Sequence, residues 1–301
     1  MIKVGLAHNL PDVANLVRHL VKHPDVEIVW MHNFGRTFPV SQQYPELMGE
    51  FDMKYTDKPD FTAINLFIGW PISNDIKDSD GLKSIFCNGY INCAGAVDHP
   101  VEIGLPEFNR KALVRGARSA YLPDEITYLG ALALMPLARN LLLGGDINAA
   151  LLLSGTDPGN PRDMAAWGSC LSDFFTQELR EKVLRPLQMS FNSTLRLLPF
   201  DVKGNVSMAT FVIDTTMNLC DIMQLYHDFY DDHRHVTVLP ENSPEVKACQ
   251  VEGTNKSVIG LKAENGRLYV SLAFDSRMKL GTGNIIHIMN LLFGLDERTG
   301  L

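Results

Sequence analysis

The sequence has no surplus of positive charge, no closely paired cysteines and no long uninterrupted apolar run. Its 27 Lys and Arg residues stand against 35 Asp and Glu, a formal net charge of −8, which argues against an electrostatic nucleic-acid binder. The five cysteines contain no C-x-x-C pair, which excludes a zinc knuckle and a dithiol redox motif and is typical of free thiols in a reducing cytoplasm. The apolar run 130–143 is interrupted by Pro136, Arg139 and Asn140. We therefore expect a cytoplasmic protein with no signal peptide, no membrane span and no nucleic-acid partner.

What the first half does contain is an alternation of strands and helices. A helix is predicted where Val13, Leu16, Val17 and Leu20 recur at helical spacing, and a second one over 124–143. Short apolar runs predict strands at 2–7, 26–30, 64–68, 83–87 and 149–153. Such alternation is typical of an α/β domain with a parallel, doubly wound sheet.

The second half is patterned differently. Helices are predicted over 219–230 and near the C-terminus, and strands at 207–214, 235–239, 257–262 and 267–274. Asn265-Gly266 between the last two strands predicts a tight hairpin turn. Consecutive strands flanked by helices indicate an antiparallel sheet in an α+β domain. We expect domain boundaries of 1–145 with 280–301, and 146–279.

Several stretches, in unchanged order, resemble one enzyme family. Gly104–Arg110 reads Gly-Leu-Pro-Glu-Phe-Asn-Arg, and 279–297 runs from Lys-Leu-Gly-Thr-Gly-Asn to Phe-Gly-Leu-Asp-Glu. With His23–Ile28 and Ser190–Ser193 they resemble the N-acetyl-gamma-glutamyl-phosphate reductase family of arginine biosynthesis. The resemblance covers nearly the whole chain. It implies a Rossmann-like domain, an inserted antiparallel semialdehyde-dehydrogenase-type domain and a homo-oligomer.

The resemblance also implies a chemistry. In the family reaction, a cysteine thiolate is acylated by an acyl phosphate and NADPH reduces the thioester to an aldehyde, with a histidine assisting. By family position, Lys279 would contact the substrate, and NADP would contact Ser154, Gly155, Gly283 and Asn284. No metal is implied.

The sequence departs from the family where that chemistry is carried. The connection Leu6–Asp12 has no glycine for a pyrophosphate, and Asp12 places negative charge near the helix start. With the tyrosine of the family's Asn-Pro-Gly-Cys-Tyr-Pro pattern set on Tyr121, the cysteine position is Ala120. The two family histidine positions hold Asp173 and Phe175.

Three hypotheses follow. The first is a catalytically inactive family member that binds a small ligand or a partner, such as an active paralogue. The second is an active NADP-dependent reductase that uses a displaced cysteine, Cys87 or Cys93. The third is an enzyme of another class, whose acid–base groups would be Asp124, Glu125 or Asp157. A metal site at His227, His233 and His235 is a further alternative to a solvated loop.

Overall fold

The computed structural model describes residues 1–7, 10, 12–70, 76, 81–87, 96–155 and 176–301. The chain divides into two compact units. The first comprises Met1–Pro123 together with Leu280–Leu301, and the second comprises Asp124–Lys279. The sequence-based boundary at 145 differs from this division because the helix that follows residue 124 packs within the second unit.

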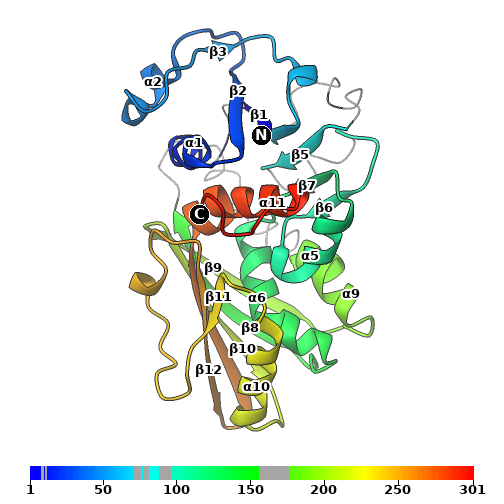
Figure 1. The fold of residues 1–301 in the computed structure, drawn as a ribbon. Coiled ribbons are helices and arrows are strands. Elements are labelled where there is room, and N and C mark those ends of the chain that lie inside the picture. Colours follow the sequence, from blue (N-terminus) through cyan, green and yellow to red (C-terminus); the bar gives the residue numbers. More distant parts are fainter. Residues whose placement is uncertain (8–9, 11, 71–75, 77–80, 88–95, 156–175) are drawn as a thin grey trace. The chain divides into compact units, whose positions relative to one another are not determined.

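The first unit is built on a seven-stranded sheet in the order β3-β2-β1-β4-β5-β7-β6, and every pairing in it is parallel (Figure 1). This confirms the predicted doubly wound α/β sheet. Its strands are β1 (Ile2–Ala7), β2 (Val26–His32), β3 (Tyr55–Thr56), β4 (Leu66–Gly69), β5 (Lys83–Phe86), β6 (Val101–Ile103) and β7 (Ser119–Tyr121). Its helical elements are α1 (Val13–Lys22), α2 (Val40–Gln43), η1 (Pro45–Leu47), η2 (Phe61–Ala63), α5 (Pro106–Arg115) and α11 (Gly283–Phe293).

The core of this unit follows from the hydrophobic pattern. Val13, Leu16, Val17 and Leu20 of α1 are buried at the predicted helical spacing. Helix α11 is apolar on nearly every side and contacts α5 and β5, which is why almost all of its side chains are buried. The last 22 residues therefore belong to the first unit.

The second unit contains a six-stranded sheet in the order β11-β12-β13-β10-β8-β9. Its strands are β8 (Ile147–Gly155), β9 (Leu195–Lys203), β10 (Val206–Asp214), β11 (Val236–Val238), β12 (Ser257–Glu264) and β13 (Arg267–Asp275). The helical elements are α6 (Glu125–Arg139), η3 (Leu179–Leu184), α9 (Arg185–Leu187), α10 (Leu219–Tyr230) and η4 (Ala248–Gln250), and η5 (Met278–Thr282) crosses into the first unit.

This second sheet is mixed. Its centre is antiparallel, as predicted, but β9 pairs with β8 and β11 pairs with β12 in parallel. Both parallel pairs are joined by long connections, which a parallel pairing requires. Asn265 and Gly266 both have positive φ, 53° and 73°, which confirms the predicted hairpin turn between β12 and β13.

Pro136 interrupts the hydrogen-bond pattern of helix α6, because it has no N–H to donate to the carbonyl of Leu132. Tyr230 of α10 replaces the missing donor, since its Oη donates to Leu132 O at 2.6 Å. Tyr226 Oη donates to the next carbonyl, Ala133 O. Both hydroxyls are buried with the helix. The pairing holds α10 against α6 and compensates the backbone of the long helix.

Candidate functional site: a carboxyl group among three serines

The residues predicted to carry or replace the family chemistry are only partly placed. Asp173, Phe175, Cys93 and Asp157 lie outside the described residues. Ala120 is fully buried inside β7, where it pairs with Ile85 and Glu102 and packs in the core of the first unit. A methyl group in that position presents nothing to a ligand.

The edge of β1 was predicted to have lost its phosphate loop. Gly5 lies within β1, and a Cβ on it would fall 2.4 Å from the ring of Trp30, so this glycine makes room for an indole. Asp12 stands in the left-handed region just before α1, and its side chain forms no capping hydrogen bond with the helix. A carboxylate there repels a phosphate from the helix terminus. Residues 8, 9 and 11 of this connection lie outside the described part of the chain, and the predicted loss of the pyrophosphate site stays a prediction.

Gly283 and Asn284 open helix α11 and are both buried. The Asn284 side-chain amide donates to Gly104 O at 2.8 Å, and Gly104 N in turn donates to Tyr121 O at 2.6 Å. Asn284 thus ties the Gly-Leu-Pro-Glu segment to α11. Its observed contact is structural, and the predicted contact with a cofactor stays a prediction.

Lys279 is buried completely, with Nζ 5.8 Å from the centre of the Tyr128 ring. Tyr128 belongs to α6 and packs edge-on against Phe274, with the ring centres 5.0 Å apart. A cation over an aromatic face is stabilised by the ring's quadrupole. The predicted substrate contact of Lys279 stays a prediction.

A cluster of polar side chains lies at one edge of the second sheet, and we call it the serine–carboxyl cluster. It consists of Glu125 from the first turn of α6, Ser154 near the end of β8, Ser207 at the start of β10, and Ser276 after β13. Strands β8 and β13 run antiparallel to β10, so the ends of two strands and the start of the third meet there.

The hydrogen bonds of this cluster converge on one oxygen. Glu125 Oε1 accepts from Ser276 Oγ at 2.8 Å and from Ser154 N at 3.1 Å. Ser154 N also donates to Ser207 Oγ at 2.9 Å, and the two serine hydroxyls lie 2.7 Å apart. Because Ser276 donates to the carboxylate, its oxygen is left to accept from Ser207. The chain of donors therefore points toward Glu125.

Two adjacent carboxyl groups begin α6, and their environments differ. Burial raises the pKa of Glu125 to about 7, although its serine and backbone hydrogen bonds act in the opposite direction. Burial also raises the pKa of Asp124 to about 6. Asp124 is occupied as the helix cap, accepting from Thr127 N at 2.8 Å and from Thr127 Oγ1 at 2.6 Å. Glu125 has no such capping role, and its side chain is partly exposed.

Asp275, the last residue of β13, supports this cluster. It is buried and accepts from the backbone N–H groups of Arg277, Met278 and Gly253 at 3.0, 3.0 and 2.7 Å. These bonds fix the turn that contains Ser276, whose own N–H donates to Asn205 O at 2.7 Å. Asp275 is therefore a positioning residue for the hydroxyl that contacts Glu125.

Glu125 and Asp124 are predicted from the sequence as acid–base groups only in the third hypothesis. It did not identify Ser207, because a serine at the start of a strand has no distinctive pattern. One signal was present: in the Asn-Pro-Gly-Cys pattern the cysteine comes two residues after the proline, and Glu125 comes two residues after Pro123.

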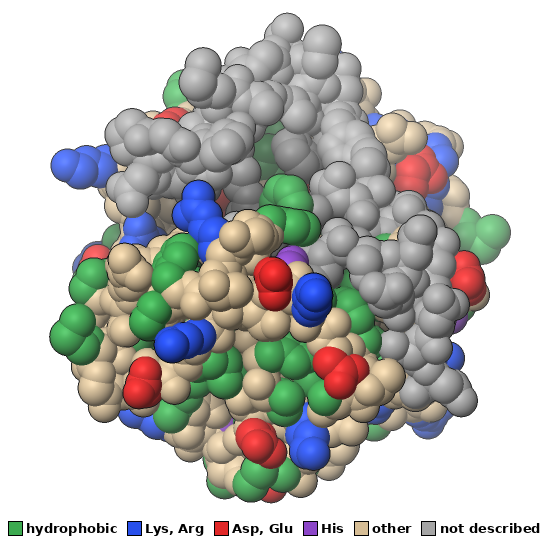
Figure 2. Space-filling model, turned by 90° about the horizontal axis from the view of Figure 1, so that it is seen from above, with side chains coloured by type: hydrophobic (Ala, Val, Ile, Leu, Met, Phe, Trp, Pro, Cys, Tyr) green, Lys and Arg blue, Asp and Glu red, His purple; other side chains and the backbone are tan. Residues whose placement is uncertain are grey.

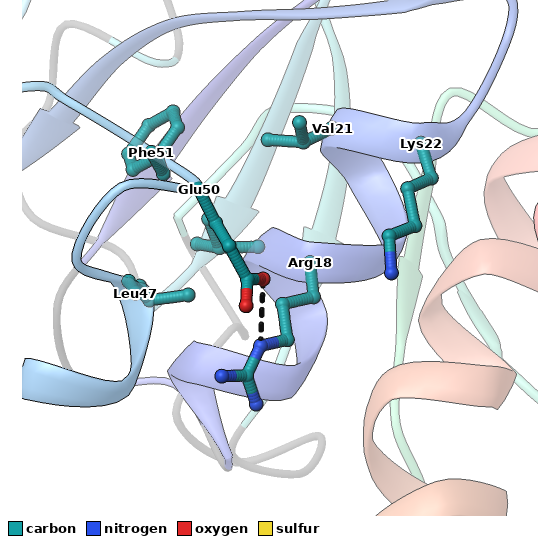
Figure 3. Close-up of a pocket in the computed structure, with 7 residues that line it drawn as sticks. Arg18, Val21, Lys22, Leu47, Glu50 and Phe51 are labelled. Atoms are coloured by element: carbon teal, nitrogen blue, oxygen red, sulfur yellow. Dashed lines mark hydrogen bonds and ion pairs between the residues drawn. The ribbon is translucent and has the colours of Figure 1, made fainter.

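A depression of about 340 Å³ lies between α1 and the segment that contains η1 and Phe51. Its lining includes apolar Val21, Leu47 and Phe51 and the Arg18–Glu50 ion pair (Figure 3). Arg18 Nε lies 2.9 Å from Glu50 Oε2, so Glu50 neutralises the charge of Arg18, and Lys22 is the second basic residue of the lining. The depression holds no nucleophile or acid–base pair.

The described part of the chain offers little for a metal ion, a membrane or a nucleic acid. No group of three or more His, Cys, Asp or Glu side chains there could hold a metal ion, and this includes His227, His233 and His235. No described helix is long and apolar enough to cross a bilayer. On the face drawn in Figure 2, basic and acidic side chains are interspersed among the coloured atoms, without a continuous basic patch.

Comparison with known proteins bears on the whole chain. An N-acetyl-gamma-glutamyl-phosphate reductase of Parabacteroides distasonis is 30% identical over 322 aligned positions, which cover 100% of this chain and 98% of that protein. The chain belongs to the N-acetyl-gamma-glutamyl-phosphate reductase family. A protein of the same name from Bacteroides thetaiotaomicron is 29% identical, with coverage of 100% and 98%. Residues 175–276 match the model of the semialdehyde dehydrogenase dimerisation domain.

Solved structures agree on the fold of this reductase-family chain. Aspartate semialdehyde dehydrogenase II from Vibrio cholerae, complexed with ASA, is similar with a TM-score of 0.67 over 98% of both chains, at 12% identity. Aspartate semialdehyde dehydrogenase from Candida albicans, with NADP, gives 0.67 over 97% of this chain and 98% of the other, also at 12% identity. The Rossmann-like domain with an inserted dimerisation-type domain is thus confirmed.

Proposed function

We propose that this family member does not carry out thiol-dependent reduction, and that it binds an acyl phosphate or the related aldehyde as a subunit of an oligomer. The observation that carries the proposal is the absence of a thiol from both positions that the family's cysteine pattern can take. One register gives the buried methyl group of Ala120, and the other gives the carboxyl group of Glu125. Neither group forms a thioester.

A displaced cysteine is the competing explanation, and it predicts an active reductase. Cys87 follows β5, is buried in the core of the first unit, and has Sγ 3.9 Å from Ile85 O. A catalytic thiolate needs access to its substrate and a setting that favours the anion. The surroundings of Cys87 are those of a structural cysteine, which supports the first proposal over this one.

The proposal also includes weak or absent binding of NADP at the usual place. NADP is suggested by the family and by the neighbour solved with NADP. The sequence of the connection Leu6–Asp12 opposes it, because this connection contains no glycine and Asp12 places a carboxyl group at the start of α1.

An apolar strip on the second sheet supports the oligomer. The strip consists of Leu152, Leu198, Phe200 and Met208, on strands that lie side by side. Leu198 is 61% exposed and Phe200 53% exposed, which is unusual for large apolar side chains in the middle of a strand. Because the matched dimerisation model covers β9 and β10, we propose a second copy of this chain as the occupant, with an active paralogue as the other candidate.

The enzymatic test is reduction of NADP⁺ by the purified protein, given N-acetylglutamate semialdehyde and phosphate, with and without a thiol-blocking reagent. We expect no turnover beside an active family member run as control. Turnover that the reagent abolishes would contradict the proposal. The variants Cys87→Ser and Cys93→Ser would then show which thiol is responsible.

The assembly test is the molar mass in solution, measured by light scattering, of the native chain and of a Leu198→Asp, Phe200→Asp variant. We expect a dimer or larger oligomer that the two charges dissociate, because apolar contacts at the centre of an interface dominate its stability. Met189→Asp is the matched control, since Met189 is 91% exposed and lies outside the strip. A native chain that is monomeric alone and assembles with an active paralogue would support the heteromeric alternative.

A further inference from the structure

The hydrogen bonds that hold the Glu125 carboxyl group indicate a function for this side chain. It is an ionisable group held by donors from three other segments, Ser154 of β8, Ser207 of β10 through its neighbours, and Ser276 after β13. A carboxyl that served only to begin a helix would need none of them, and Asp124 already caps α6. The arrangement orients one carboxyl oxygen and leaves the side chain partly exposed.

The position of Glu125 in the chain connects it to a ligand. Laying the family's Pro-Gly-Cys pattern on Pro123–Asp124–Glu125 puts the carboxyl at the first turn of the helix, in the place of the nucleophile. One partner of Glu125 is also a family position, because the resemblance places Ser154 among the cofactor contacts. In this register the carboxyl group stands where the family's nucleophile is expected.

The protonation chemistry suits a base. The donor chain from Ser154 N through Ser207 and Ser276 favours the ionised carboxylate, and burial disfavours it. These opposing effects leave the pKa of Glu125 at about 7. Near neutral pH the ionised form is therefore still present, and it is a stronger base than a carboxylate with an ordinary pKa.

We propose that Glu125 is the general base of a hydrolytic reaction in which water attacks the acyl carbon of a bound acyl phosphate. This inference rests on the proposed function for the substrate class. Glu125 takes a proton from the water molecule while the oxygen of that water bonds to the acyl carbon. The bond between that carbon and the phosphate oxygen breaks, with the electron pair leaving on phosphate. The products are a carboxylic acid and inorganic phosphate, the proton on Glu125 passes to solvent, and nothing is oxidised or reduced.

Ser276 is a positioning residue in this scheme. Its hydroxyl stabilises the ionised form of Glu125, so its removal raises the pKa of the base without removing the base itself. Asp275 does not contact Glu125 but fixes the turn that holds Ser276, by accepting from the N–H groups of Arg277 and Met278. These roles predict different pH profiles for different variants, which a purely structural cluster would not produce.

The experiment follows disappearance of the acyl phosphate, by the hydroxamate reaction, with the full-length protein and two probes, acetyl phosphate and synthetic N-acetyl-gamma-glutamyl phosphate. We expect hydrolysis faster than in buffer for the second probe, unchanged by NADPH or a thiol-blocking reagent, with a rate that rises around pH 7. Glu125→Gln should reduce the rate by about 100-fold or more. Ser276→Ala should retain activity with its pH profile displaced to higher pH.

The matched control is Glu181→Gln, since Glu181 is an exposed glutamate paired with Arg185 on the same unit. It should hydrolyse the probe as the native protein does. Glu125→Asp guards against misfolding: a folded variant with partial activity supports the base. No hydrolysis of either probe, or full activity in Glu125→Gln, would overturn the inference. Oxidation of NADPH by the acyl phosphate would instead overturn the proposed function, so the two failures are distinguishable.

Discussion

The two units contain glutamates whose environments shift the pKa in opposite directions. In the first unit, Glu297 lies between two basic side chains, with Oε2 2.7 Å from His287 Nε2 and Oε1 2.6 Å from Arg110 Nε. These partners lower its pKa to about 2, chiefly through the His287 contact. In the second unit, Glu125 has only neutral donors, and burial raises its pKa to about 7.

The difference separates a carboxyl group that is held ionised from one whose protonation changes near neutral pH. Glu297 is held ionised across the working pH range, and it fastens the C-terminal segment to α5 and α11. Glu125 can change its protonation state near neutral pH. Neutral hydrogen bonds orient a group without fixing its charge, whereas a close cation does both. Perturbed carboxyl groups of the second kind are the ones expected at functional sites.

The largest expected effect on stability is at Glu125. A raised pKa in the folded state means that stability is highest below the unfolded value near 4.5 and is lost as the pH rises toward 7. Glu125→Gln removes that loss, so we expect it to stabilise the fold by about 1–3 kcal/mol at pH 8. Urea unfolding at pH 8 and pH 5 measures this, and the gain should shrink at pH 5. Destabilisation at pH 8 would mean that the serine donors dominate over burial.

The next largest effect on stability concerns the hydrogen bond from Tyr230 to the carbonyl that Pro136 leaves without a donor. Tyr230→Phe leaves Leu132 O without its donor and should cost about 1–2 kcal/mol. In a Pro136→Ala background the restored N–H can serve the same carbonyl, so the cost should fall. A double-mutant cycle by urea unfolding measures the coupling. Tyr269→Phe, on the partly exposed face of β13, is the control and should change stability by less than about 0.5 kcal/mol.

The smallest expected effect is at Glu297, whose ion pairs are partly exposed. Glu297→Gln should destabilise the fold by about 1 kcal/mol at pH 7. A lowered folded pKa contributes stability above the unfolded value near 4.5 and loses it as the pH falls toward 2. The difference between native protein and variant, followed by thermal unfolding from pH 7 to pH 3, should therefore diminish on the acid side. If it grew there, the comparison of the two glutamates would be wrong.

The sequence predicted most of the elements for clear physical reasons. The spacing of Val13, Leu16, Val17 and Leu20 and the Asn265-Gly266 turn are local signals, and both are confirmed. Strand β9 was not predicted, because Leu195, Leu197 and Leu198 alternate poorly and Pro199 interrupts them. The mixed pairing of the second sheet also escaped prediction, since sequence does not specify which strands become neighbours across a long connection.

By itself, the sequence determined the family, the two kinds of sheet and the absence of a cysteine from its expected position. Those properties reside in motifs, periodicities and single residue identities, which are read along the chain. The tertiary structure alone brought Glu125 together with Ser154, Ser207 and Ser276, which are up to 151 residues apart. It also showed that the side chains of Asp275 and Asn284 form hydrogen bonds with backbone groups. A pKa and a hydrogen-bond partner depend on distance in space and on burial, and neither quantity exists before the chain has folded.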